Sequence, residues 1–196
     1  MSFLTFPLVS LIVGTAAASS PNHACRVMKP TLQQFATVEN NAGCVIHRID
    51  PKTSEVEFLL VYVEKGDDKG WSLPGGKPAT KKNDVKEGPI AQALAARVPY
   101  DYSEPAVCTA SRETFEETGM EVVVEELIEQ QEKFLVFKCS PVDPGDVLED
   151  IKAIDTREVH KTTWATLKQA QAAEFPLRFV SDRALLQKAH ERIVRE

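Results

Sequence analysis

Apolar residues recur in short, nearly unbroken runs along the chain from residue 42 onward. The run at 56–63, Val-Glu-Phe-Leu-Leu-Val-Tyr-Val, predicts a strand that is covered on both faces. Comparable runs predict further strands, at 42–49, 121–127, 132–139 and 158–166, with a short one ending at Trp71. Helix-like spacing predicts helices, at 89–98, 103–118, 167–173 and 179–194. The set predicts one α/β (α+β) sandwich domain over residues 36–196, with a mixed β-sheet between helices.

Residues 3–18 form an apolar stretch without a charged side chain, broken by a proline and a glycine. The stretch is shorter than the roughly 20 apolar residues of a membrane-spanning helix, so we expect no membrane span. Small residues near its end predict a signal peptide over 1–19, a connector over 20–35, and secretion. The first basic residue is Arg26, so the usual basic start is missing, and a cytoplasmic protein with an apolar arm stays the alternative.

The helix expected to end near residue 118 carries Glu113, Glu116 and Glu117 three and four residues apart, which places them on one side. Gly119 is suited to the left-handed conformation that ends a helix. Three crowded carboxylates repel one another. Mg2+, which prefers oxygen ligands, would offset this repulsion by binding between them. A solvated acidic face on a surface helix is the alternative.

A glycine turn precedes this helix in the run Trp-Ser-Leu-Pro-Gly-Gly-Lys at 71–77. Gly75 and Gly76 let the backbone approach a ligand closely. Lys77 follows directly and offers a cation beside that turn.

A glycine turn followed by an acidic helix resembles the signature of the Nudix hydrolases over roughly residues 40–195. That signature is Gly, five residues, Glu, seven residues, then Arg-Glu-aliphatic-any-Glu-Glu-any-Gly-aliphatic. The second half matches closely, with Glu104, Arg112, Glu113, Glu116, Glu117, Gly119 and Met120 at the required spacing. The resemblance implies a mixed sheet between helices and hydrolysis of a diphosphate linkage.

Two departures from the signature stand out. Thr114 occupies an aliphatic position, and Phe115 is a candidate for the missing core contact. Between Gly76 and Glu104 lie 27 residues instead of five, which makes about 77–103 an insertion. The peroxisomal coenzyme A diphosphatase branch carries a long insertion before a similar Arg-Glu-Thr-Phe-Glu-Glu run. Glu87 competes with Glu104 for the first glutamate, but no arginine follows it eight residues on.

The resemblance also implies roles for these residues. Glu116, Glu117 and the Gly75 carbonyl are implied metal ligands for Mg2+, with Mn2+ as an alternative ion. Glu113 is implied as a ligand or general base, Arg112 as the residue that holds it, and Glu104 as the residue that orients the helix.

Further roles are expected outside the carboxylate helix. Gly76 and Lys77 are candidate substrate contacts. In many members of the family a glutamate outside the signature acts as the base, and Glu149 and Glu158 are the candidates here.

The net charge of −6 argues against DNA and anionic membranes as partners and favours a small-molecule substrate. The insertion shared with the coenzyme A diphosphatase branch favours coenzyme A as the substrate. A diphosphoinositol polyphosphate is favoured by the lysines at 65, 69, 77, 81, 82 and 86. A capped RNA is less favoured, given the acidic charge. A secreted member would be similar to the Nudix enzymes that plant pathogens export. The rival interpretation is a Nudix-fold binding module without turnover, and the oligomeric state stays open.

Four cysteines, Cys25, Cys44, Cys108 and Cys139, show no Cys-x-x-Cys pair, so no zinc site is expected. Cys44 and Cys139 fall in predicted strands, where a buried apolar cysteine is the simplest interpretation. In a secreted chain, four cysteines allow three pairings, and the sequence does not choose among them.

Overall fold

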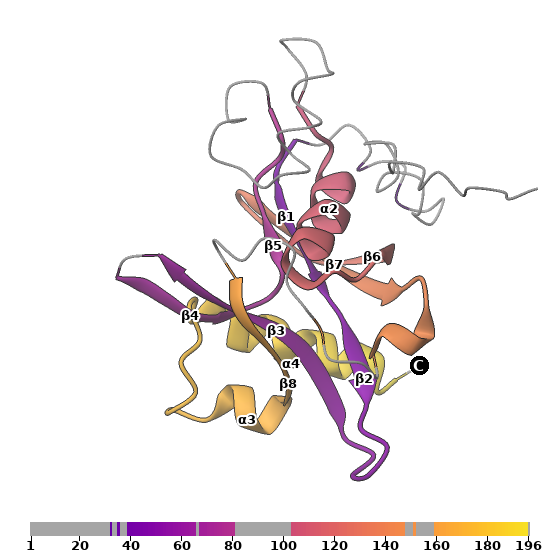
Figure 1. The fold of residues 1–196 in the computed structure, drawn as a ribbon, viewed down its shortest axis with the longest axis vertical. Coiled ribbons are helices and arrows are strands. Elements are labelled where there is room, and N and C mark those ends of the chain that lie inside the picture. The colour runs from indigo at the N-terminus through magenta and orange to yellow at the C-terminus, as the bar shows by residue number, and fades with distance from the viewer. Residues whose placement is uncertain are drawn as a thin grey trace, which may run out of the picture.

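Two four-stranded sheets and three helices make up the part of the chain that the computed structural model describes. That part comprises residues 32, 35, 39–65, 67–80, 103–147, 151 and 159–195. Helix α2 covers one sheet, and α4 lies behind the other in the view of Figure 1. The prediction of a mixed α/β sandwich is confirmed, and the strands are divided between two sheets. None of the described helices is long and apolar enough to span a membrane.

The first sheet has the order β5-β1-β7-β6 and underlies the carboxylate helix. Its strands are β1 (Asn41–Val45), β5 (Gly75–Gly76), β6 (Val122–Gln131) and β7 (Phe134–Pro141). β1 runs parallel to β7 and antiparallel to β5, so the sheet is mixed. The glycine pair is itself the edge strand, and this fixes the turn against β1.

The second sheet is centred on β3 (Val56–Lys65), with β8 (Val159–Thr166) along one edge. Its other edge is shared by β2 (His47–Ile49) and β4 (Asp68–Ser72). The four central residues of β3, from Phe58 to Val61, are fully buried, which confirms the prediction of a strand covered on both faces. The strand predicted at 42–49 is in fact two strands, because the chain passes from one sheet to the other at Ile46, whose carbonyl accepts from Leu59 N–H at 3.0 Å.

Helix α2 (Ala106–Thr118) begins later than the sequence predicted. Pro105 is its N-cap residue and supplies no capping side chain, so Ser103 does not cap this helix. Ser103 pairs instead with Thr80 in an isolated β-bridge, and Glu104 precedes the helix rather than lying in its first turn. At the other end Gly119 has the predicted left-handed conformation, with φ of 75°.

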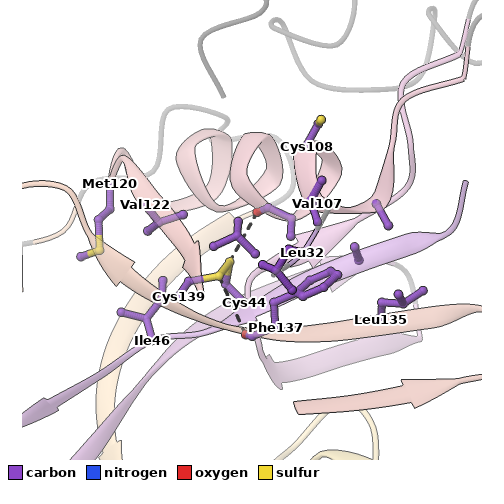
Figure 2. Packing of buried hydrophobic residues seen from close by; sticks show 14 of the residues in the cluster. Leu32, Cys44, Ile46, Val107, Cys108, Met120, Val122, Leu135, Phe137 and Cys139 are labelled. Atoms are coloured by element: carbon purple, nitrogen blue, oxygen red, sulfur yellow. Dashed lines mark hydrogen bonds between the residues drawn. A yellow bond between two sulfur atoms is a disulfide. The ribbon is translucent and has the colours of Figure 1, made fainter. Parts of the chain in front are cut away.

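The space between α2 and the first sheet is filled by apolar side chains, as Figure 2 shows. Alternate residues of β7, namely Leu135, Phe137 and Cys139, face α2, while Val136 faces the second core. Helix α4 (Ser181–Ile193) closes that second core with Leu185, Leu186 and Ala189, together with the short helix α3 (Leu167–Gln171). A 3-10 turn, η3 (Pro144–Val147), follows β7.

Cys44 and Cys139 form a disulfide between the neighbouring strands β1 and β7 (Figure 2). The expectation that both are buried apolar thiols is therefore wrong, although both residues are buried. Since the two cysteines are 95 positions apart in sequence, their pairing depends on the parallel β1–β7 contact.

Several expectations fall outside the described residues. They are the signal peptide, nearly all of the connector, the helix at 89–98, and the lysines at 81, 82 and 86.

Candidate active site

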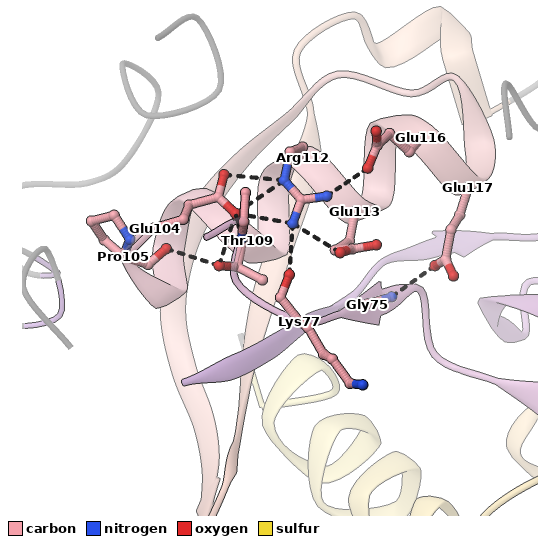
Figure 3. A network of polar contacts seen from close by, with 10 residues as sticks. Gly75, Lys77, Glu104, Pro105, Thr109, Arg112, Glu113, Glu116 and Glu117 are labelled. Carbon is pink, nitrogen blue, oxygen red and sulfur yellow. Dashed lines mark hydrogen bonds and ion pairs between the residues drawn. The ribbon is translucent and has the colours of Figure 1, made fainter. Parts of the chain in front are cut away.

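Arg112, in the middle of α2, is the centre of a buried polar network (Figure 3). Its side chain is only 2% exposed. The Nε atom donates to both carboxylate oxygens of Glu104, at 3.1 and 3.0 Å, and Nη1 donates to Glu116 at 2.5 Å. The Nη2 atom donates to Glu113 at 2.8 Å and to the Lys77 carbonyl at 2.7 Å. One guanidinium therefore fixes three carboxylates and the backbone directly after β5.

Glu104 ties the far end of the insertion to this network. One of its carboxylate oxygens accepts from Ala79 N–H at 3.0 Å and from the Thr109 hydroxyl at 3.2 Å. Its own N–H donates to the Ala79 carbonyl at 3.1 Å. The two ends of the insertion are thus joined next to Arg112, so the extra residues leave this network intact. Glu87 lies outside the described residues.

The remaining glutamates of the helix face the glycine turn. Glu117 accepts from Gly75 N–H at 2.8 Å. A Cβ atom added to Gly76 would lie 2.5 Å from the Glu113 carboxyl carbon, so only glycine leaves room for that carboxylate. The Lys77 side chain is exposed and points away from the carboxylates in Figure 3.

The electrostatics of the cluster follow from burial. Burial raises the pKa of the Glu113 carboxyl to about 7; the Arg112 charge opposes this rise, and the Glu116 carboxylate adds to it. Burial also works against the charge of Arg112, but Glu113, Glu104 and Glu116 outweigh it and raise the pKa of Arg112 above its ordinary value. With three carboxylates around one guanidinium, and Glu117 beside the Gly75 amide, the group is acidic overall.

Within the described part of the chain, no three His, Cys, Asp or Glu side chains are gathered tightly enough to hold a metal ion as they stand. Glu113 and Glu116 turn to Arg112, and Glu117 turns to the Gly75 amide. The donor set nevertheless fits a hard divalent cation, because it consists of carboxylate oxygens on one helix face beside a glycine cradle.

Comparison with solved structures identifies the architecture. An Ap4A hydrolase of C. elegans, in a binary complex, aligns with 81% of this chain and 100% of its own, at 19% identity and a TM-score of 0.52. The chain has the Nudix fold. A Nudix hydrolase from Nitrosomonas europaea aligns with 79% of this chain and 90% of its own, at 19% identity and a TM-score of 0.49. No family model and no curated protein matches the sequence.

Thr114 is the departure from the Nudix signature that the structure explains least well. Its side chain is fully buried, while Phe115 is only partly buried, so Phe115 does not take over the core position. The Thr114 hydroxyl has no hydrogen-bond partner among the described residues. A threonine fills the space of an aliphatic residue here but buries an unsatisfied polar atom.

Three contacts of the Nudix network were not anticipated from the sequence. They are the Ala79 amide, the Thr109 hydroxyl and the Lys77 carbonyl. Thr109 lies five residues after Glu104, and that local spacing could have indicated it, whereas the two backbone groups carry no sequence signal. Glu149 and Glu158, the other candidate bases, lie outside the described residues.

Proposed function

We propose that this chain is a Mg2+-dependent hydrolase that cleaves a diphosphate linkage in a phosphorylated small molecule. The observation that carries the proposal is the Arg112 network, which keeps Glu113 and Glu116 on the helix face that Glu117 shares, against the Gly75 turn. Three carboxylates that share one guanidinium leave a net negative charge in a buried cluster, and such a charge is costly unless a cation balances it.

In this proposal Glu113, Glu116, Glu117 and the Gly75 carbonyl hold Mg2+, with Mn2+ as a substitute. When bound, the ion would supply charge neutralisation for the diphosphate. The chain's own residues do the rest. Arg112 orients Glu113 and Glu116 through charge-assisted hydrogen bonds, and Glu104 fixes Arg112 from the opposite side.

The general base in this proposal is one of three glutamates: Glu113, Glu149 or Glu158. Glu113 is supported by its burial beside the glycine turn, where it faces the position that a Cβ at Gly76 would fill. Lys77 is exposed immediately after the same turn and is the candidate contact for a substrate phosphate.

The proposal covers two substrate classes: a diphosphoinositol polyphosphate and a nucleoside diphosphate derivative such as coenzyme A. The name of the C. elegans relative, an Ap4A hydrolase, supports the nucleotide class. The exposed side chains of Lys65, Lys69 and Lys77 support the inositol class.

The alternative function is a Nudix-fold module that binds a diphosphate ligand without turnover. Two features favour this alternative: Thr114 at an aliphatic position of the signature, and the insertion between Gly76 and Glu104. The test is chromatographic detection of cleavage products formed by the wild type, with and without Mg2+, from a diphosphoinositol polyphosphate, coenzyme A, ADP-ribose, a dinucleoside polyphosphate and a capped RNA. Mg2+-dependent cleavage of the diphosphate linkage in one of them supports the hydrolase, and binding without cleavage supports the module.

We also propose that the protein is secreted, since the apolar start of the chain resembles a signal peptide. The Cys44–Cys139 disulfide supports an oxidising compartment. The mature N-terminus of protein expressed in its secretory host tests this: cleavage near residue 19 supports secretion, and an intact Met1 in the cell extract contradicts it.

A further inference from the structure

Cys108 is the buried cysteine of helix α2, four residues before Arg112 (Figure 2). It is only 3% exposed, and it belongs to the apolar core between α2 and the first sheet. Its sulfur takes part in a disulfide, and the described residues include no free cysteine. A second disulfide is therefore attached to the helix that carries the carboxylates.

The pairing of the other cysteines leaves one partner for Cys108. The chain has four cysteines, and Cys44 and Cys139 are bonded to each other between β1 and β7. Of the three pairings that four cysteines allow, only one contains this bond. In that pairing the partner of Cys108 is Cys25, which lies outside the described residues.

The direction of the Cys108 side chain agrees with a partner outside the first sheet. The Cys44–Cys139 bond lies between the sheet and α2, with Cys44 Sγ 3.8 Å from the Ala110 carbonyl oxygen. In Figure 2 the Cys108 side chain points away from that bond. Its sulfur is therefore directed to another part of the chain than β1 and β7.

The described residues nearest to Cys25 in the sequence lie in the same core. Leu32 is 3% exposed and belongs to the cluster that contains Cys108. Phe35 packs edge-on against Phe137, with the ring centres 5.8 Å apart. Seven positions separate Cys25 from Leu32, and an extended chain of that length covers up to about 25 Å. The chain before Leu32 is therefore long enough to reach the start of α2.

A bond at Cys108 acts on the part of α2 that precedes the Arg112 network. The next residue, Thr109, donates to Glu104 at 3.2 Å, and Arg112 lies about one helical turn further on. Pro105, the N-cap residue, offers no side-chain hydrogen bond, so this end of the helix lacks a common source of stability. A covalent bond in the first turn supplies a constraint where that cap is missing.

We propose that a disulfide between Cys25 and Cys108 anchors the N-terminal segment to α2 and stabilises the turn of the helix that precedes Arg112. The bond forms by thiol–disulfide exchange: the two thiols give up two protons and two electrons, which reduce a donor disulfide to its two thiols. The inference goes beyond the proposed function and holds for either substrate class. Cleavage of a signal peptide near residue 19 would leave Cys25 in the mature chain.

Peptide mapping of the full chain from its secretory host tests the pairing. Free thiols are blocked with iodoacetamide during unfolding, and the protein is digested with trypsin without reduction. Lys and Arg residues separate the four cysteines into different peptides, namely one that ends at Arg26, then 27–48, 98–112 and 139–152. We expect peptide 98–112 to be joined to the peptide that ends at Arg26. Peptide 98–112 with a blocked thiol, or joined to any other peptide, would overturn the inference.

Two single variants and their combination test whether the bond stabilises the fold. Cys25→Ala leaves the buried Cys108 side chain in the core and should lower the midpoint of thermal unfolding by about 5–15 °C. Cys108→Ala should lower it by at least as much. Adding Cys25→Ala to Cys108→Ala should then lower it by no more than about 2 °C, because the bond is already lost. Losses that add up in the double variant would contradict the bond.

Amide hydrogen exchange locates the effect within the fold. The amides of 108–112 in α2 should exchange at least about tenfold faster in Cys25→Ala than in the wild type, and those of 185–189 in α4 should change by less than about twofold. Exchange in α2 that is unchanged, or that rises no more than in α4, would overturn the anchoring role. Neither measurement uses a substrate, so the disulfide and the hydrolase are tested separately.

Discussion

Arg112 and Glu104 form a buried ion pair, each only 2% exposed, with both Glu104 carboxylate oxygens within 3.1 Å of the Arg112 Nε atom. Their positions in the chain differ by eight, yet the pair joins the end of a long insertion to the carboxylate helix. Removing one partner of such a pair leaves an unbalanced buried charge, which destabilises the fold more than replacing both partners by apolar residues.

We therefore expect Arg112→Met to lower the free energy of unfolding by about 3–5 kcal/mol, because Glu104 keeps its charge and loses its main partner. Glu104→Gln should cost less, since a glutamine can still accept from Ala79 N–H and Thr109. Urea unfolding of the two variants measures both values. An Arg112→Met protein within about 1 kcal/mol of the wild type would show that the network is not important for stability.

Gly76 and Glu113 are a second pair of residues in close contact at the site. Gly76→Ala places a methyl group where the Glu113 carboxylate lies, so that side chain has to move. Turnover should fall by roughly 100-fold, since displacement of about 1 Å in a catalytic group has effects of that size. Gly145→Ala is the control, because its added Cβ meets only the exposed Asp143 side chain, at 3.1 Å. Equal activity of the two variants would contradict the assigned position of Glu113.

Thr114 and Thr109 are both fully buried on α2 but differ in their hydroxyl partners. Thr114→Val removes an unsatisfied hydroxyl and should raise the free energy of unfolding by about 1 kcal/mol. Thr109→Val removes a hydrogen bond to Glu104 and should lower it by about 1 kcal/mol. The same chemical change is thus expected to have opposite signs at the two positions in denaturant unfolding. A loss of stability at both would mean that the Thr114 hydroxyl has a partner.

Asp182 gives the protein a pH-dependent stability. Burial raises the pKa of its carboxyl from 3.8 to about 7, with the Arg178 charge opposing the rise. The pKa of Asp182 is higher in the folded protein than in the unfolded chain. Between about pH 4 and pH 7 the folded protein therefore keeps a proton that the unfolded chain has already lost. This contribution to stability is complete below pH 4 and is lost as the pH rises to 7, with a slope of up to about 1.4 kcal/mol per pH unit.

Asp182→Asn cannot titrate and should lack this component. The free energy of unfolding is measured for the wild type and the variant at pH 5 and at pH 7.5. The variant should gain on the wild type as the pH rises, and a constant difference between the two would show that Asp182 is charged throughout.

The elements that the sequence predicted well are those determined by local pattern. Residues close in sequence determine three such features: the buried run of β3, the carboxylate face of α2 and the cap at Gly119. The start of α2 was misplaced because Ser103, a good capping residue by type, pairs with Thr80 across the insertion instead.

Contacts between distant segments could not be predicted in the same way. Nothing near Cys44 indicates that its partner is Cys139, and Asp68 and Arg178 are 110 positions apart. The position of Asp182 depends on such contacts, because β4 holds the segment before α4 in place. The Nudix signature located the carboxylates of α2, while Asp182 belongs to no local motif.

The central claim is that the carboxylates of α2 support Mg2+-dependent cleavage of a diphosphate. It is tested most directly by kcat/KM of Glu117→Gln beside Glu121→Gln, with Mg2+, on the substrate that the wild type hydrolyses. Glu121 is an exposed residue just beyond α2, and its backbone carbonyl accepts from Val142 N–H at 2.8 Å. We predict a loss of roughly 100-fold or more in Glu117→Gln and wild-type activity in Glu121→Gln, with both proteins folded. Undiminished Mg2+-dependent hydrolysis by Glu117→Gln would contradict the account.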